Sequence, residues 1–232
     1  MSDHVLGRKL IIPNTKMVEV FNEYWTQTPS HTEIKLYEDG DCIDVTKYIE
    51  EFSIYEKEDQ SIFRTEDLKD FLNKINQTYH TRVTGISQIV EEMSKRGIHS
   101  KNDLKLYIEK RKLSVPQFTG ICKEATGSYT YSFATKVFSF IDESFPIVDS
   151  IVATLLNEYE YEGKITPKSK WGDYSLYVKN YEAFQQVFGL EKESRKRIDK
   201  FLWTYGKILE AYWVDLGVLR FDPVSFAPGT IE

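Results

Sequence analysis

The sequence has few cysteines, no metal-binding spacing and no phosphate-binding loop. Its two cysteines, Cys42 and Cys122, are too few and too far apart for a disulfide framework or a four-ligand zinc site, so we expect two free thiols. The four histidines are scattered along the chain, and neither a glycine-rich loop nor a Gly-x-Ser-x-Gly motif occurs. The sequence therefore predicts no metal ion and no cofactor.

The sequence also lacks a long apolar run and an excess of positive charge. No stretch of about 18 apolar residues is present, and the first residues lack the basic-then-apolar order of a secretory signal. We therefore expect a cytoplasmic protein that does not bind a membrane. The net charge of −6 argues against broad, non-specific binding of nucleic acid, which depends on a basic face. A local basic patch is compatible with that charge.

What is present is the composition of a folded globular protein. Hydrophobic residues make up 41% of the chain and charged residues 28%, far from the signature of disorder. The 232 residues suffice for one large domain or two small ones. Fourteen phenylalanines, fifteen tyrosines and four tryptophans supply much apolar area, so most of them should form core.

The spacing of apolar residues predicts a mainly α-helical fold. Apolar residues recur every three or four positions along most of the chain, which is the period of an amphipathic helix. Residues 34–45 instead alternate on both sides of an Asp-Gly turn, which predicts one small β-hairpin. In the second half, helices are predicted over residues 133–141, 149–159, 173–188 and 194–216. We expect two lobes, residues 1–125 with the hairpin and residues 126–232.

A lysine and an aspartate mark the segment with the strongest chemical pattern. Lys136 lies within the helix predicted over residues 133–141, and Pro146 forces the chain that precedes it out of helical conformation. Asp149 is then placed to cap the next helix, with its carboxylate accepting from the amide of Ile151 or Val152. Such a cap would hold the carboxylate oxygens in a defined position.

Four short motifs carry a resemblance to a known family. They are Ala-Thr-Lys at residues 134–136, Phe-Pro-Ile-Val-Asp-Ser at 145–150, Trp-Gly-Asp-Tyr at 171–174 and Asp-Lys-Phe-Leu-Trp-Thr-Tyr-Gly at 199–206. With them the chain resembles the helix-hairpin-helix DNA glycosylase superfamily, in particular the 8-oxoguanine DNA glycosylases, and more closely a sparsely described bacterial group. The resemblance covers roughly the last two fifths of the chain. It implies a multi-helix, glycosylase-like bundle there.

The resemblance implies a DNA glycosylase or lyase that excises a damaged base. Lys136 would attack the sugar carbon, and Asp149 would stabilise the positive charge that develops on the sugar. A lysine attacks only as the neutral amine, which apolar neighbours favour; the candidates are Phe133, Phe138 and Phe140. The iron–sulfur cysteines of some relatives are absent, so no cofactor is implied.

Damaged DNA would then be the partner, and a cluster of cations would bind its phosphates. Arg195, Arg197 and Lys200 are the best candidates for this nucleic-acid-binding role. The glycines that approach phosphate in the family's hairpin are missing here, where Ser132, Phe133 and Ala134 occupy the positions before the lysine. Phosphate binding would therefore depend on side chains rather than on that hairpin.

A second interpretation is a non-enzymatic helical interaction protein that keeps a glycosylase-like fold. A lysine and an aspartate at neighbouring helix ends commonly form a surface ion pair and an N-cap without any catalytic role. The enzyme interpretation requires Lys136 and Asp149 to face one open pocket, with Arg195, Arg197 and Lys200 at its mouth. The sequence leaves both interpretations open, and it does not identify a protein partner.

Overall fold

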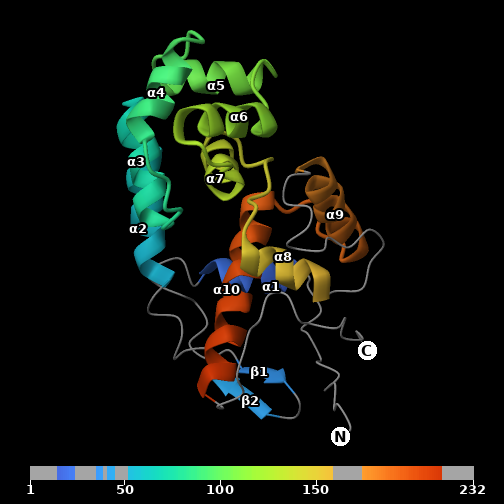
Figure 1. Cartoon of the computed structure of the whole chain (residues 1–232). Helices are drawn as coiled ribbons and strands as arrows, with labels where there is room; N and C mark the ends of the chain where they lie inside the picture. Colours follow the sequence, from blue (N-terminus) through green and yellow to red (C-terminus); the bar gives the residue numbers. More distant parts are fainter. Residues whose placement is uncertain (1–14, 24–34, 39–40, 45–51, 159–173, 216–232) are drawn as a thin grey trace, which may run out of the picture. The chain divides into compact units, whose positions relative to one another are not determined.

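The computed structural model describes residues 15–23, 35–38, 41–44, 52–158 and 174–215. Over these residues the protein is mainly α-helical, as predicted (Figure 1). Two short strands, β1 (Lys35–Glu38) and β2 (Asp41–Asp44), pair antiparallel with Lys35 opposite Asp44. The Asp39-Gly40 turn, Trp171 and the chain after residue 215 lie outside the described residues.

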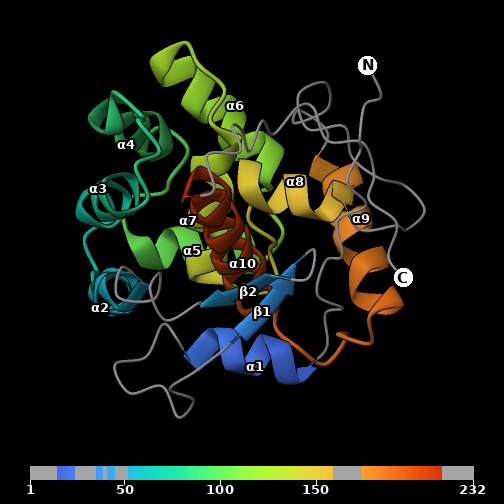
Figure 2. The ribbon, with the colours of Figure 1, turned by 90° about the horizontal axis from the view of Figure 1, so that it is seen from below.

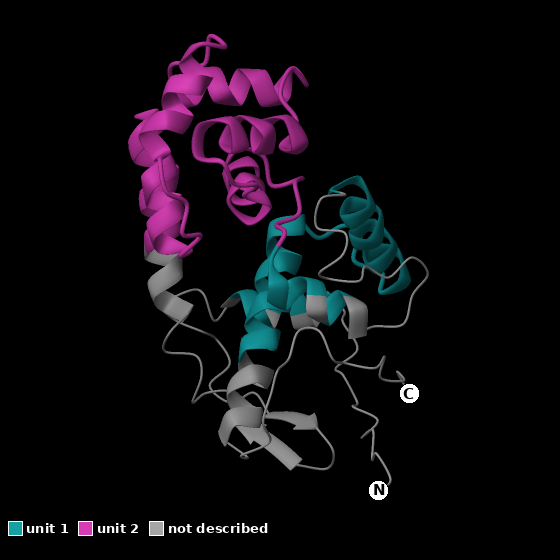
Figure 3. Ribbon diagram, in the orientation of Figure 1, with its two compact units in different colours: residues 1–54, 149–232 teal, residues 55–148 magenta. Residues whose placement is uncertain are grey.

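The chain forms two compact units, and the second is inserted into the first (Figure 3). Unit 1 contains residues 1–54 and 149–232, and unit 2 contains residues 55–148. The two lobes expected from the sequence, residues 1–125 and 126–232, stay a prediction beside these units, which are defined by contacts. Residues 126–148 thus belong to unit 2, and the first 54 residues share a unit with the C-terminal part.

Unit 2 is a group of helices whose ends are set by local capping. They are α2 (Phe52–Phe63), which belongs to this unit from Tyr55 onward, α3 (Leu68–Thr78), α4 (Ile86–Ser94), α5 (Lys101–Glu109), α6 (Val115–Thr126) and α7 (Tyr131–Ile141). Asp67 caps α3, and Ser100 and Ser114 form capping boxes with Asp103 and Gln117 at the starts of α5 and α6. All residues of α7 from 133 to 140 are buried, so this helix forms the centre of the unit and packs against α3, α5 and α6.

Cys122 lies in the core of unit 2 on α6 as a free thiol, as predicted. Burial raises the pKa of this thiol to about 11. Among the described residues, no helix is long and apolar enough to cross a membrane. In that same part of the chain, no three histidine, cysteine or acidic side chains gather as metal ligands would.

Unit 1 is built around its last helix. Its helices are α1 (Thr15–Glu23), α8 (Ser150–Glu158), α9 (Tyr174–Val187) and α10 (Arg195–Asp215). Helix α10 packs against both α1 and α8, and the position of each helix can be followed in Figures 1 and 2. The Phe21 ring of α1 meets the Phe201 ring edge-on at 5.1 Å, and Asn22 Nδ2 donates to the Arg197 carbonyl at 2.8 Å. Residues from opposite ends of the sequence therefore share one core.

A glycine allows α8 and α10 to approach closely. A Cβ atom on Gly206 would lie 2.2 Å from Ile151 Cγ2 and 3.2 Å from Leu155 Cδ1. Only a residue without a side chain fits this crossing. The close approach matters for the site, because Ile151 lies in the first turn of α8, directly after Asp149 and Ser150.

Candidate functional site

Lys136 lies in the middle of α7 and is buried, with an exposed fraction of 5%. Its Nζ donates to Ser132 Oγ at 2.8 Å, one helical turn earlier on the same face. The same nitrogen lies 5.7 Å from the centroid of the Tyr79 ring. The amine is therefore held in one position by a hydroxyl and an aromatic face from two different helices.

Tyr79 connects this lysine to a buried carboxylate. The Tyr79 hydroxyl donates to Asp59 Oδ1, and Asp59 is 1% exposed. The Tyr79 ring also contacts Phe140, which follows Lys136 by one turn, with centroids 5.9 Å apart. We call Asp59, Tyr79, Ser132 and Lys136 the Lys136 cluster. It lies entirely within unit 2.

The three phenylalanines proposed to surround Lys136 are all buried but have different neighbours. Phe140 shares the Tyr79 ring with Lys136. Phe133 and Phe138 instead contact Phe118 of α6, at centroid distances of 6.2 and 5.9 Å. The polar members of the cluster, Asp59 and Tyr79, were not predicted, because they lie far from Lys136 in sequence and no local pattern links them to it.

The hydroxyl of Tyr79 is expected to contribute measurably to the stability of unit 2. Tyr79→Phe keeps the ring over Lys136 but removes a hydrogen bond to a buried carboxylate, which should lower the free energy of unfolding by about 1–3 kcal/mol in urea titrations. Tyr129→Phe is the matched control, because its hydroxyl bonds Lys123 in a ring that is 62% exposed. We expect the free energy of unfolding of that control to stay within about 0.5 kcal/mol of the wild-type value. Equal losses of stability in the two variants would contradict a stabilising hydrogen bond between Tyr79 and Asp59.

Asp149 is the N-cap of α8, as predicted. Its Oδ1 accepts from the Ile151 amide at 2.9 Å, and its carbonyl accepts from the Ala153 amide at 2.8 Å. The side chain is half-buried. The preceding residue, Val148, donates its amide to Thr135 Oγ1 at 3.0 Å. The residue before Asp149 is thus bonded to the residue before Lys136.

Asp149 adjoins a group of buried tyrosines on α9. Burial is the main cause that holds the pKa of Tyr177 well above its usual range, and the nearby carboxylates of Asp199 and Asp149 raise it further. Burial also raises the pKa of Tyr181, whose hydroxyl donates to the Arg195 carbonyl at 3.0 Å. Asp199, from the last of the four motifs, therefore lies in the same interior as Asp149. The spacing of these tyrosines along α9 is the signal from which their shared burial could have been predicted.

The predicted phosphate-binding cations belong to unit 1, and the two arginines form ion pairs. Arg195 Nη2 lies 2.7 Å from Glu182 Oε1, and Arg197 Nη1 lies 2.8 Å from Glu193 Oε2. Lys200 is half-buried. Both arginine charges are thus partly neutralised within the protein. A phosphate would have to compete with these carboxylates for the same donors.

The chain matches no known family model, no curated protein and no solved structure.

Proposed function

We propose that the protein is a DNA glycosylase of the lyase type, with Lys136 as nucleophile and Asp149 as the carboxylate that stabilises the charged sugar. The fixed position of the Lys136 amine, which donates to the Ser132 hydroxyl and lies over the Tyr79 ring, supports this proposal most. Lysine is almost never buried unless it is paired or serves a function. An amine held in one position needs little reorganisation before it attacks.

The proposed chemistry has two steps. In the first, the Lys136 nitrogen forms a bond to the sugar carbon that carries the damaged base, the glycosidic bond breaks with its electrons leaving on the base, and the base takes up the proton that the nitrogen loses. In the second, the nitrogen forms a second bond to that carbon while the bond from the carbon to the ring oxygen breaks, and the ring oxygen takes up the other amine proton, which leaves an imine between protein and DNA. A carboxylate that already accepts a backbone amide, as Asp149 does, is a fixed negative charge for the cationic sugar.

Thr135, which precedes Lys136, accepts from the Val148 amide, and this bond lies within unit 2. Asp149 is the first residue of the second segment of unit 1, so its place beside Lys136 is part of the proposal. The proposal also includes a glycosylase-like arrangement of the helices, with a small N-terminal hairpin. It includes a cytoplasmic role in DNA repair, with damaged DNA as the partner and no cofactor.

A specific observation favours the second candidate, a non-enzymatic helical interaction protein. Lys136 is only 5% exposed, and a nucleophile has to reach its substrate. The ion pairs of Arg195 and Arg197 also favour this candidate, because they occupy guanidinium donors that a DNA-binding enzyme would use to bind phosphates. In that case the Lys136 cluster would serve stability alone.

Covalent trapping with mapping of the attached residue decides between the two candidates. The wild-type protein is incubated with a duplex that contains one abasic site, borohydride is added, and the product is digested and analysed by mass spectrometry. The proposal expects a reduced, covalent adduct on Lys136 and none when borohydride is omitted. Absence of any adduct, together with no excision across a panel of damaged bases, would leave the interaction protein. An adduct on another lysine would refute the assignment of Lys136.

A further inference from the structure

Positive charge is concentrated in one segment of unit 2. Eight of the chain's 30 lysines and arginines lie between Lys95 and Lys123, together with only two of its 36 acidic residues. The net charge of −6 for the whole chain conceals this local excess. A count over a short window of the sequence would have revealed it.

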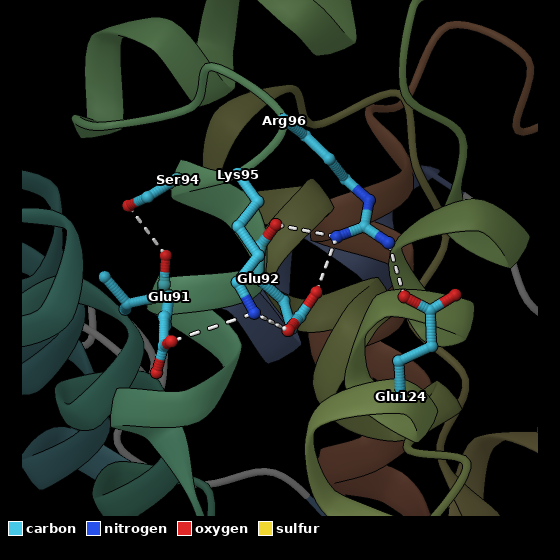
Figure 4. Close-up of polar contacts among 7 residues, drawn as sticks. Glu91, Glu92, Ser94, Lys95, Arg96 and Glu124 are labelled. Atoms are coloured by element: carbon cyan, nitrogen blue, oxygen red, sulfur yellow. Dashed lines mark hydrogen bonds and ion pairs between the residues drawn. The ribbon is translucent and has the colours of Figure 1, made fainter.

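Part of this positive charge is neutralised by neighbouring carboxylates. Lys95 and Arg96 pair with Glu92, and Arg96 also pairs with Glu124 of α6 (Figure 4). Lys105 lies 3.7 Å from Glu109. Three of the eight cations, Lys95, Arg96 and Lys105, are therefore already in ion pairs.

Four other cations have no carboxylate within ion-pair distance in the part of the chain that the structure describes. Three of them, Lys110, Arg111 and Lys112, are consecutive in the turn between α5 and α6 and are exposed. The fourth, Lys123, bonds the Tyr129 hydroxyl. The turn has a defined conformation, because Arg111 adopts a left-handed φ of 53° and the Lys112 amide donates to the Tyr107 carbonyl at 2.8 Å. Three unpaired positive charges are thus presented from a fixed backbone.

A cavity of about 470 Å³ adjoins this turn. Its walls include apolar side chains, two cations, one carboxylate and an aromatic ring; they are Ile98, Leu113 and Ile121, Arg96 and Lys112, Glu124, and Tyr107. The Tyr107 hydroxyl donates to the Arg96 carbonyl at 2.9 Å, which fixes the ring. A Cβ atom on Gly120, which also lines the cavity, would meet nothing within 4 Å. The volume lies in the range of small-molecule sites.

We infer that this cavity and the Lys110–Lys112 turn bind one nucleotide of a DNA strand, with the base against Tyr107 and the phosphate against Lys112. An aromatic face beside an apolar wall suits any base, and unpaired cations in a row suit consecutive phosphates. Arg96 is already paired with Glu124, whereas Lys112, whose Nζ lies 5.8 Å from the centroid of the Tyr107 ring, has no carboxylate within ion-pair distance among the described residues. The inference rests on the proposed function, since it names the contacts by which unit 2 would hold the DNA.

Fluorescence anisotropy with a labelled single-stranded DNA dodecamer tests the charge contribution. Lys110→Gln combined with Lys112→Gln is expected to raise Kd about tenfold and to reduce the slope of log Kd against log salt by about 1.4, for two phosphate contacts. The control is Lys95→Gln combined with Lys105→Gln, which removes the same charge from ion-paired positions. We expect the Kd of that control to stay within about twofold of the wild-type Kd. An equal loss of affinity in both variants would show a general charge effect and overturn the proposed site.

Two substitutions of Tyr107 test the base contact in the same assay. Tyr107→Leu removes the ring and should weaken binding about fivefold or more, whereas Tyr107→Phe keeps the ring and should bind within about twofold of wild type. Equal binding by Tyr107→Leu and wild type would overturn the base contact. If the protein bound a mononucleotide but not the dodecamer, the inference that this site binds a DNA strand would be overturned.

The trapping experiment separates this inference from the proposed function. If Lys136 is trapped but the Lys110 and Lys112 substitutions leave dodecamer binding unchanged, the inference is overturned and the proposed function stands. If those substitutions weaken dodecamer binding but no adduct is trapped, the proposed function is overturned and the DNA-binding site stands. Absence of both would overturn both.

Discussion

Lys136→Gln is expected to abolish borohydride trapping with abasic DNA, and Asp149→Asn is expected to lower base excision by about 10²–10³-fold with the fold intact. Glutamine has no nucleophilic amine, so no imine can form. Asparagine is a good N-cap and should keep the bond to the Ile151 amide, but its neutral amide cannot offset the positive charge of the sugar. Single-turnover excision and trapped yield on gels, with unfolding curves for each variant, measure the two effects separately.

The matched control for the trapping is Lys101→Gln. Lys101 is also in unit 2, its Nζ lies 4.9 Å from the centroid of the Phe71 ring, and burial lowers its pKa. It is thus another lysine of unit 2 with its amine over an aromatic ring, and its replacement should leave trapping unchanged. Trapping that persists in Lys136→Gln and disappears in Lys101→Gln would show that the wrong lysine has been assigned.

Gly206→Ala is expected to lower the free energy of unfolding by about 1–3 kcal/mol, although alanine favours a helix more than glycine does by about 1 kcal/mol. The added methyl group would lie 2.2 Å from Ile151 Cγ2, which is attached directly to the branched Cβ and cannot move far. Helices α8 and α10 would have to separate, and the first turn of α8 would shift. Because the Ile151 amide bonds Asp149, excision should fall together with stability.

Two further variants distinguish a steric clash from a general intolerance of helix substitution. Gly120→Ala, in α6, meets open space and should stabilise the protein by roughly 0.5–1 kcal/mol. Adding Ile151→Ala to Gly206→Ala removes the clashing methyl group, so a double-mutant cycle should give a favourable coupling of about 0.5–3 kcal/mol. Additive effects of the two substitutions, or a Gly206→Ala protein as stable as wild type, would contradict the close crossing.

The helices of the second half could be predicted from local sequence because their causes are local. Helix α8 was expected over residues 149–159 and α10 over 194–216, and they run over Ser150–Glu158 and Arg195–Asp215. Apolar periodicity, Pro146 and the capping carboxylate of Asp149 act within a few residues of each other, so one sequence suffices to read them. The cap at Asp149, half of the candidate site, was found in this way.

The surroundings of Lys136 and of the arginines were decided only by the tertiary structure. The Tyr79 ring reaches Lys136 from a distant part of the chain, and Asp59 bonds that tyrosine. Glu182 on α9 pairs with Arg195 on α10 across 13 residues, whereas Glu193 pairs with Arg197 four residues later, a spacing that the sequence already contains. Burial and long-range pairing depend on which surfaces meet, and no local pattern encodes that. The sequence by itself therefore determined the helices, the cap and the spacing of the Glu193–Arg197 pair, while packing decided that Lys136 is an enclosed amine and that Arg195 is paired with Glu182.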